Sequence, residues 1–166
     1  MLNNTAKNYI IDECLKSVNP EETIDILISQ CKDNTEINEI FDILVNNSAI
    51  PSDISMLAIA KSVDLYNEGN TKPFKELLTN HYNSTIGKIK SMSTNLEFSE
   101  YIFDTLLEEH SYTITGPDLI DIVRIMDNEA TRQNKKLNVP GLHVFRKFVD
   151  ETLKEYENET INNDER

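Results

Sequence analysis

The sequence predicts an all-α protein, folded as a compact bundle of about seven to eight short-to-medium helices with no significant β-sheet. Apolar residues recur at helical spacing almost without interruption, and helix-start signals follow one another at intervals of about 15 to 23 residues. Only residues 111–115 alternate as a strand does. Because a single five-residue strand finds no partner elsewhere in the chain, we interpret this stretch as an extended linker.

The first three helices are indicated by their N-terminal caps and by apolar stripes. A first helix is expected near residues 4–18. The second starts at Asn19-Pro20, because asparagine caps a helix and proline at the first helical position loses no hydrogen bond. The third starts at Asp33 or Asn34. The three stripes follow the spacing of one helix face: Ile10, Ile11, Cys14 and Leu15; Ile24, Leu27, Ile28 and Cys31; and Ile37, Ile40, Phe41 and Leu44.

The fourth helix opens at Pro51 and is apolar on more than one side. It is therefore the helix we expect to be most buried, either at the centre of the monomer or sealing a dimer. Gly69 is expected just past its end, in the left-handed conformation that glycine adopts most readily. A fifth helix starts at Thr71 and carries its apolar stripe as one helix as far as Ile89.

Three further helices complete the predicted bundle. Thr94 and Glu97 match a capping box that opens the sixth helix. The seventh begins at Gly116-Pro117 and the eighth at Pro140. Their expected core stripes are Leu119, Ile122, Val123 and Met126, followed by Leu142, Phe145, Val149, Leu153 and Tyr156.

One helical domain is expected over residues 1–157, with a soft boundary near residues 111–116. Residues 158–166 lack apolar spacing and are expected to form a frayed C-terminal tail. Three short segments have similar sequences: residues 24–27, 41–44 and 119–122. They do not recur at a fixed interval, which favours convergence of helical patterns over a solenoid repeat.

The charge of the chain bears on its partners. The 166 residues include 29 acidic and 16 basic side chains, a net charge of −13. Such a charge repels phosphate, so non-specific affinity for nucleic acid is disfavoured and a protein partner with a basic surface is favoured. We expect no membrane partner and a cytoplasmic location, since no apolar run approaches ~20 residues and no secretory signal is visible. The 19 Asn and 19 Ile residues point to an AT-rich gene, such as a phage or low-GC bacterial one.

The sequence carries no motif for catalysis. The glycine-rich phosphate loops are missing, and Cys14 and Cys31 lie on apolar stripes, as core cysteines do. His81, His110 and His143 fall on three separate predicted helices, without the Glu-x-x-His spacing of di-iron bundles. We therefore predict a protein that is not an enzyme, with no catalytic residue, no cofactor and no metal site. A metal-dependent helical enzyme that uses these histidines is the least favoured hypothesis.

One basic corner stands out from the acidic chain. Residues 124–147 hold six basic and two acidic side chains, and the candidate binding residues among them are Arg132, Lys135, Lys136, Arg146 and Lys147. In one interpretation, the last two helices outline a helix-turn-helix that binds nucleic acid. In the other, Lys135 and Lys136 interact favourably with the negative, C-terminal end of the seventh predicted helix. Arg146 and Lys147 then pair with Asp150 and Glu151. The loop over residues 131–139 is longer than the tight turn of that motif, which favours the second interpretation.

The function that we predict is that of a non-catalytic acidic helical protein acting through protein–protein interaction. It would serve as an adaptor, an inhibitor, or an assembly or regulatory factor. The alternative is a nucleic-acid-binding regulator that uses the basic corner at residues 124–147. Homo-oligomerisation is compatible with these hypotheses and with that of a metal-dependent enzyme.

Overall fold

The structure, a computed structural model, describes residues 2–109 and 113–164. Within these residues it contains nine helices and no strand, which confirms the all-α class. The helix count exceeds the seven to eight expected. The helices are α1 (Asn4–Lys16), α2 (Pro20–Ser29), α3 (Asn34–Asn46), α4 (Ser52–Asn67), α5 (Lys72–Asn80), α6 (Tyr82–Met92), α7 (Leu96–Glu109), α8 (Gly116–Arg132) and α9 (Leu142–Asp164).

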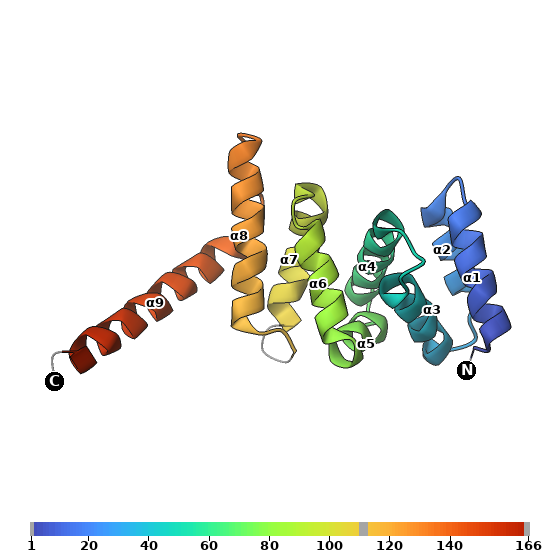
Figure 1. The fold of residues 1–166 in the computed structure, drawn as a ribbon, viewed down its shortest axis with the longest axis horizontal. Helices are drawn as coiled ribbons and strands as arrows, with labels where there is room; N and C mark the ends of the chain where they lie inside the picture. The colour runs from blue at the N-terminus through green and yellow to red at the C-terminus, as the bar shows by residue number, and fades with distance from the viewer. Residues whose placement is uncertain (1, 110–112, 165–166) are drawn as a thin grey trace.

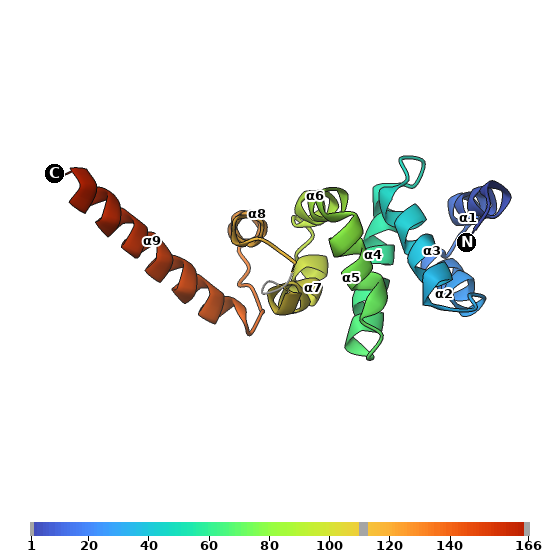
Figure 2. The same cartoon turned by 90° about the horizontal axis from the view of Figure 1, so that it is seen from below.

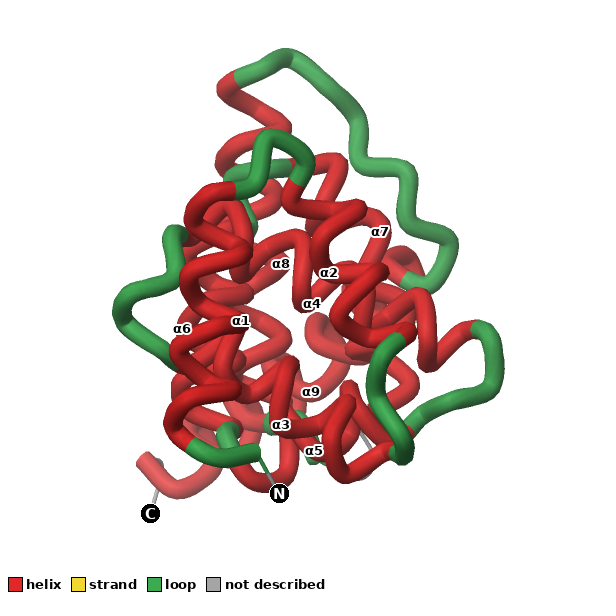
Figure 3. Tube along the Cα trace, turned by 90° about the vertical axis from the view of Figure 1, so that its right-hand side faces the viewer, coloured by secondary structure: helices red, strands yellow, loops and turns green. Residues whose placement is uncertain are grey.

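The helices follow one another in chain order along the long axis of the molecule (Figure 1). Helices α1 and α2 lie at one end, and α9 projects from α8 at the other, which Figure 2 shows from below. Figure 3 looks along this axis from the end formed by α1 and α2, and shows the loops that join the helices around the periphery, one of them much longer than most. Because each helix packs mainly on helices near it in the sequence, the two ends of the chain have separate surroundings.

Helix α4 lies at the centre of the fold. It packs against α2, α3, α5, α6 and α7, and its residues Ala58, Ile59 and Val63 are completely buried. The apolar sides of this helix are therefore covered within one chain, as expected for the core of a monomer.

The helix starts follow the side-chain caps predicted from the sequence, with one correction. The side chains of Asn19 and Asp33 accept hydrogen bonds from backbone amides three residues further on. At α7, however, the cap is Asn95 rather than Thr94. The Asn95 carboxamide oxygen accepts from the Phe98 amide at 3.1 Å, because Asn95 directly precedes the first helical residue.

The expected fifth helix is interrupted at His81, which raises the helix count. His81 has φ −133° and ψ 42°, so α5 ends before it and α6 begins after it. The Thr85 hydroxyl donates to the Leu77 carbonyl across the break at 3.2 Å. The break lets α5 pack on α3 and α4 while α6 turns towards α8. Tertiary packing therefore overrides the continuous apolar stripe.

Gly69 ends α4 in the expected conformation, with φ +108°. The Gly69 amide donates to the Tyr66 carbonyl at 3.2 Å, and the Asn70 amide donates to the Leu65 carbonyl at 2.8 Å. This pair of hydrogen bonds is the Schellman motif, which satisfies the last carbonyls of the helix.

Two glycine substitutions test this conformation separately from packing. A Cβ atom added to Gly69 or to Gly87 meets no other atom within 4 Å. Gly69→Ala is expected to destabilise the fold by about 1–2 kcal/mol, because an L-residue is strained at positive φ. Gly87→Ala, inside α6, is expected to stabilise it by about 0.5–1 kcal/mol. Urea denaturation measures the free energy of unfolding of both variants. Equal changes of the same sign in the two variants would contradict this explanation.

Helix α9 starts later and runs further than its sequence pattern indicates. Pro140 lies in a turn before the helix, where the Leu142 amide donates to the Val139 carbonyl at 3.0 Å. The helical backbone then continues to Asp164, through most of the expected tail. Fraying of residues 158–166 and the domain limits stay predictions.

Most of the expected linker and His110 lie outside the described residues. Among the helices that are described, none combines the length and the apolar composition needed to cross a membrane.

Candidate functional site

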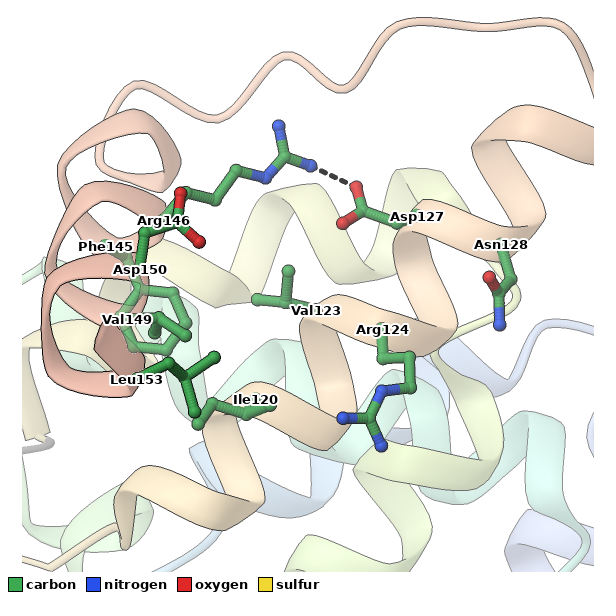
Figure 4. A pocket seen from close by; sticks show the side chains of 10 residues that line it. All are labelled: Ile120, Val123, Arg124, Asp127, Asn128, Phe145, Arg146, Val149, Asp150 and Leu153. Carbon is green, nitrogen blue, oxygen red and sulfur yellow. Dashed lines mark hydrogen bonds and ion pairs between the residues drawn. The ribbon is translucent and has the colours of Figure 1, made fainter. Parts of the chain in front are cut away.

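The five predicted binding residues lie on two helices and the loop between them. Arg132 is in the last turn of α8, and Lys135 and Lys136 follow it in the exposed loop. Arg146 and Lys147 are in the second turn of α9. The loop returns the chain so that Arg146 meets Asp127 on α8 (Figure 4). The fold therefore brings the two helices of the basic corner together, while Lys135 and Lys136 stay in the loop.

Two of these five residues are already engaged in ion pairs. Arg132 binds Glu129 through its Nε atom at 3.0 Å and through a second guanidinium contact. Hydrogen bonds from Arg132 and Gln133 lower the pKa of Glu129 to about 2. The expected pairing of Arg146 with Asp150 is wrong, because the guanidinium reaches Asp127 across the helix–helix junction instead. The basic corner thus presents less free positive charge than its composition indicates.

A groove of about 440 Å³ lies between α8 and α9 (Figure 4). Apolar side chains line both walls, and polar side chains surround them. The apolar residues are Ile120, Val123, Phe145, Val149 and Leu153; the polar residues are Arg124, Asp127, Asn128, Arg146 and Asp150. The lining residues lie within residues 120–128 of α8 and 145–153 of α9. At a rise of about 1.5 Å per residue, the groove is about 12 Å long.

The two ends of the groove differ in openness. The Arg146–Asp127 ion pair joins the helices on the side of the loop (Figure 4). With increasing distance from the loop the two helices diverge, as α9 leaves the body of the molecule (Figure 1). The Asp150 side chain lines the groove beside Arg146 (Figure 4), whereas Asp121 is not among the lining residues and binds Lys90 at 3.1 Å. The charged side chains that line the groove are therefore balanced, with Arg124 and Arg146 against Asp127 and Asp150.

The apolar stripe of α9 is only partly covered. Leu142 and Phe145 are 3% and 8% exposed, and the Phe145 ring packs edge-on against Phe103 of α7 at 5.9 Å. Further along the same stripe, Val149 is half-buried and Leu153 is 52% exposed. The sequence marks all four as core residues. It does not reveal the groove, because periodicity shows that side chains share a face and not whether another helix covers it.

The histidines are not brought to one site among the residues that the structure describes. His81 Nε2 lies 3.0 Å from Asp42 Oδ1, beside α3, and His143 is exposed on α9. His110 is outside the described residues. In the described part of the chain, no group of three or more His, Cys, Asp or Glu side chains could hold a metal ion. The metal-enzyme hypothesis gains no support from these residues.

A buried carboxyl lies elsewhere, between α4 and α7. Glu109 is 1% exposed, and one of its carboxylate oxygens has no hydrogen-bond partner within the described residues. Burial raises the pKa of the Tyr66 hydroxyl, as do its hydrogen bonds to Glu109 and Glu108. These contacts join two core helices.

The fold and the groove together define a class: an all-α protein whose last two helices form a largely apolar groove at one end of a stack of helices. Comparison with known proteins finds no matching family model, no matching curated protein and no matching solved structure.

Proposed function

We propose that this is a non-catalytic helical protein that acts through protein–protein contact, and that the α8–α9 groove docks an amphipathic helix of its partner. The observation that carries this proposal is the groove itself, whose apolar walls continue into the uncovered stripe of α9. An adaptor, an inhibitor or an assembly factor would each use such a surface.

The shape of the groove favours a helix as its occupant. It is open and elongated, and about two and a half turns of each flanking helix line it. Helix-in-groove recognition uses such a surface, because apolar side chains at i, i+3, i+4 and i+7 of the incoming helix fill the space between two others.

The charge around the groove favours basic flanks on that helix. Helix α9 carries Asp150, Glu151, Glu155 and Glu157 against Lys154 alone along and beyond the groove. The net charge of −13 steers a basic partner towards the molecule from a distance. A protein partner with a basic surface therefore suits both the groove and the whole chain.

Nucleic-acid binding is the weaker proposal. Asp127 and Glu129 neutralise Arg146 and Arg132, so Lys135, Lys136 and Lys147 are left as the free cations of the five candidate residues in the described structure. A protein with a charge of −13 repels phosphate around that corner.

A designed helical peptide with a leucine stripe and lysine flanks tests the docking function. We expect the labelled peptide to bind in a fluorescence anisotropy titration, and a version with glutamate flanks to bind at least tenfold more weakly. Leu153→Ser is expected to weaken binding of the lysine peptide about tenfold, which corresponds to about 1.4 kcal/mol. It removes an exposed apolar wall and leaves the core intact.

Val18→Ser is the matched control, because Val18 is fully exposed between α1 and α2, far from the groove. It is expected to leave the affinity within twofold. Equal affinity of Leu153→Ser and the parent protein would overturn the groove as the docking site. Binding of duplex DNA at low salt that Lys135→Glu with Lys136→Glu abolishes would instead establish the nucleic-acid alternative.

A further inference from the structure

Two of the four charged side chains that line the α8–α9 groove are not neutralised within it. Arg146 and Asp127 bind each other (Figure 4). The Arg124 side chain is 69% exposed, and its one ion pair within the described residues is a 3.7 Å contact with Asp121. Asp150 makes no ion pair with any described residue. Arg124 and Asp150 are therefore the lining charges that an occupant of the groove can bind.

These two side chains lie on opposite walls of the groove and at the same level along it. Arg124 is on α8 and Asp150 is on α9 (Figure 4). Counted away from the loop, Arg124 lies three residues beyond Asp127, and Asp150 lies four residues beyond Arg146, its ion-pair partner. At about 1.5 Å per residue, these steps are about 4.5 Å and about 6 Å. The groove thus places a cation on one wall across from an anion on the other.

A helix docked between the two walls presents a different flank to each of them. A helix with its side chains is about 10–12 Å across, and its apolar stripe has a polar flank on either side. When the stripe faces the groove, one flank lies along α8 and meets Arg124, and the other lies along α9 and meets Asp150. A guanidinium group binds carboxylates with two parallel hydrogen bonds. The α8 wall therefore favours an acidic residue, and the α9 wall a basic one.

We propose that Arg124 and Asp150 make the groove selective for a helix with one acidic and one basic flank, and that they fix the direction in which it docks. This inference rests on the proposed function, since it specifies the helix that the groove binds. The basic flank lies along α9, whose residues 150–157 hold four acidic side chains and one basic one. Turning the docked helix end for end exchanges its flanks, so only one direction satisfies both walls.

A mixed peptide, with a leucine stripe, glutamate along one flank and lysine along the other, tests the selectivity by fluorescence anisotropy. We expect it to bind the parent protein about threefold more tightly than the peptide with lysine on both flanks, because Arg124 then meets carboxylates. Arg124→Glu is expected to weaken binding of the mixed peptide about tenfold and to strengthen binding of the lysine peptide about threefold. Loss of folding would weaken both, so these opposite changes report on the Arg124 charge itself.

Lys16→Glu is the matched control for net charge. It makes the same change in charge as Arg124→Glu, at an exposed site in the last turn of α1, which lies at the other end of the stack (Figure 1). We expect it to leave the affinity for each peptide within about twofold, because exposed charges that far apart are screened by salt. Equal changes in Lys16→Glu and Arg124→Glu would overturn Arg124 as the selecting residue.

Exchange of the two charges across the groove tests the direction of docking. Asp150→Lys alone is expected to weaken binding of the mixed peptide about tenfold, and together with Arg124→Glu to restore it to within about threefold, with the peptide reversed. A benzophenone group at the peptide N-terminus, followed by mass spectrometry, identifies the protein segment to which that end cross-links. In the double variant the cross-link should move to the opposite end of the groove. An unmoved cross-link, or absence of restoration, would overturn the inferred direction.

The failure of this inference and that of the proposed function give different results. If Leu153→Ser weakens binding of both peptides but Arg124→Glu changes neither affinity, the groove docks a helix without this selectivity, and the inference alone falls. If neither peptide binds the parent protein, both proposals fall. A parent protein that sediments as a dimer, and that the mixed peptide dissociates, would overturn a separate partner, because a second copy of this chain would then fill the groove.

Discussion

Replacing Phe145 with alanine is expected to release α9 from the body of the protein and to destabilise its docking by about 3–5 kcal/mol. Phe145 is 8% exposed and meets Phe103 of α7 edge-on, with ring planes at 72°. It is the largest buried side chain of α9 in the described structure. Its removal leaves a cavity where the first turns of the helix pack on the body, and the groove loses one of its apolar lining side chains.

Hydrogen exchange followed by mass spectrometry measures this effect helix by helix. Amides of α9 should exchange much faster in Phe145→Ala, whereas those of α3, α4 and α5 should keep their protection, because these helices pack at a distance from α9. Phe148→Ala is a matched control on the same helix. Phe148 is 58% exposed, so its loss should change stability by less than about 0.5 kcal/mol. Equal effects of the two variants would show that the body does not hold α9 through Phe145.

The second large effect is expected at Asp118, which joins α8 to α6. Its carboxylate accepts hydrogen bonds from Lys90 at 2.7 Å, from the Thr115 hydroxyl at 2.8 Å and from the Tyr82 hydroxyl. Its side chain is 21% exposed. Asp118→Asn is expected to cost about 2 kcal/mol, because it removes the charge from a partly buried network and leaves Lys90 with a weaker acceptor.

The same residue predicts how stability depends on pH. Burial raises the pKa of Asp118, but the hydrogen bonds from Lys90, Tyr82 and Thr115 outweigh it and hold the pKa below 3.8. A carboxyl whose pKa is lower in the folded state stabilises the fold above its unfolded pKa. That contribution is lost as the pH falls through the folded value. The parent protein should therefore lose stability more steeply than Asp118→Asn below about pH 4.

Urea denaturation at pH 7 and at pH 3 measures both expectations. Asp121→Asn is the control, because Asp121 binds the same Lys90 at 3.1 Å but is 46% exposed. We expect this substitution to lower the free energy of unfolding by less than about 1 kcal/mol at pH 7. The loss of stability between pH 7 and pH 3 should stay close to that of the parent protein. A larger loss in Asp121→Asn than in Asp118→Asn would mean that the exposed carboxylate holds α8 in place.

Local structure follows closely from the sequence. Asn19 and Asp33 cap helices because an oxygen one residue before a helix reaches an unpaired amide within it, and this needs no distant partner. Gly69 likewise ends α4 through backbone freedom alone. The break at His81 follows from no such local rule. Apolar spacing continues across it, and only the positions of α3, α4 and α8 decide that the chain must turn there.

In the candidate site, too, some features are evident from the sequence and others depend on tertiary packing. The stripe of Leu142, Phe145, Val149 and Leu153 is evident in the sequence, and so is the excess of basic residues at 124–147. That Phe145 is buried while Leu153 is exposed, and that Arg146 binds Asp127 rather than Asp150, depends on where α7 and α8 lie relative to α9.

The sequence by itself determined the helical class, most helix starts, the net charge and which side chains share a face, since these depend on residues within a few positions of one another. The tertiary structure decided which faces are covered, which charges are neutralised and where a groove is left open. Burial and ion pairing depend on residues far apart in the chain, and no local pattern encodes the angle at which α9 leaves α8.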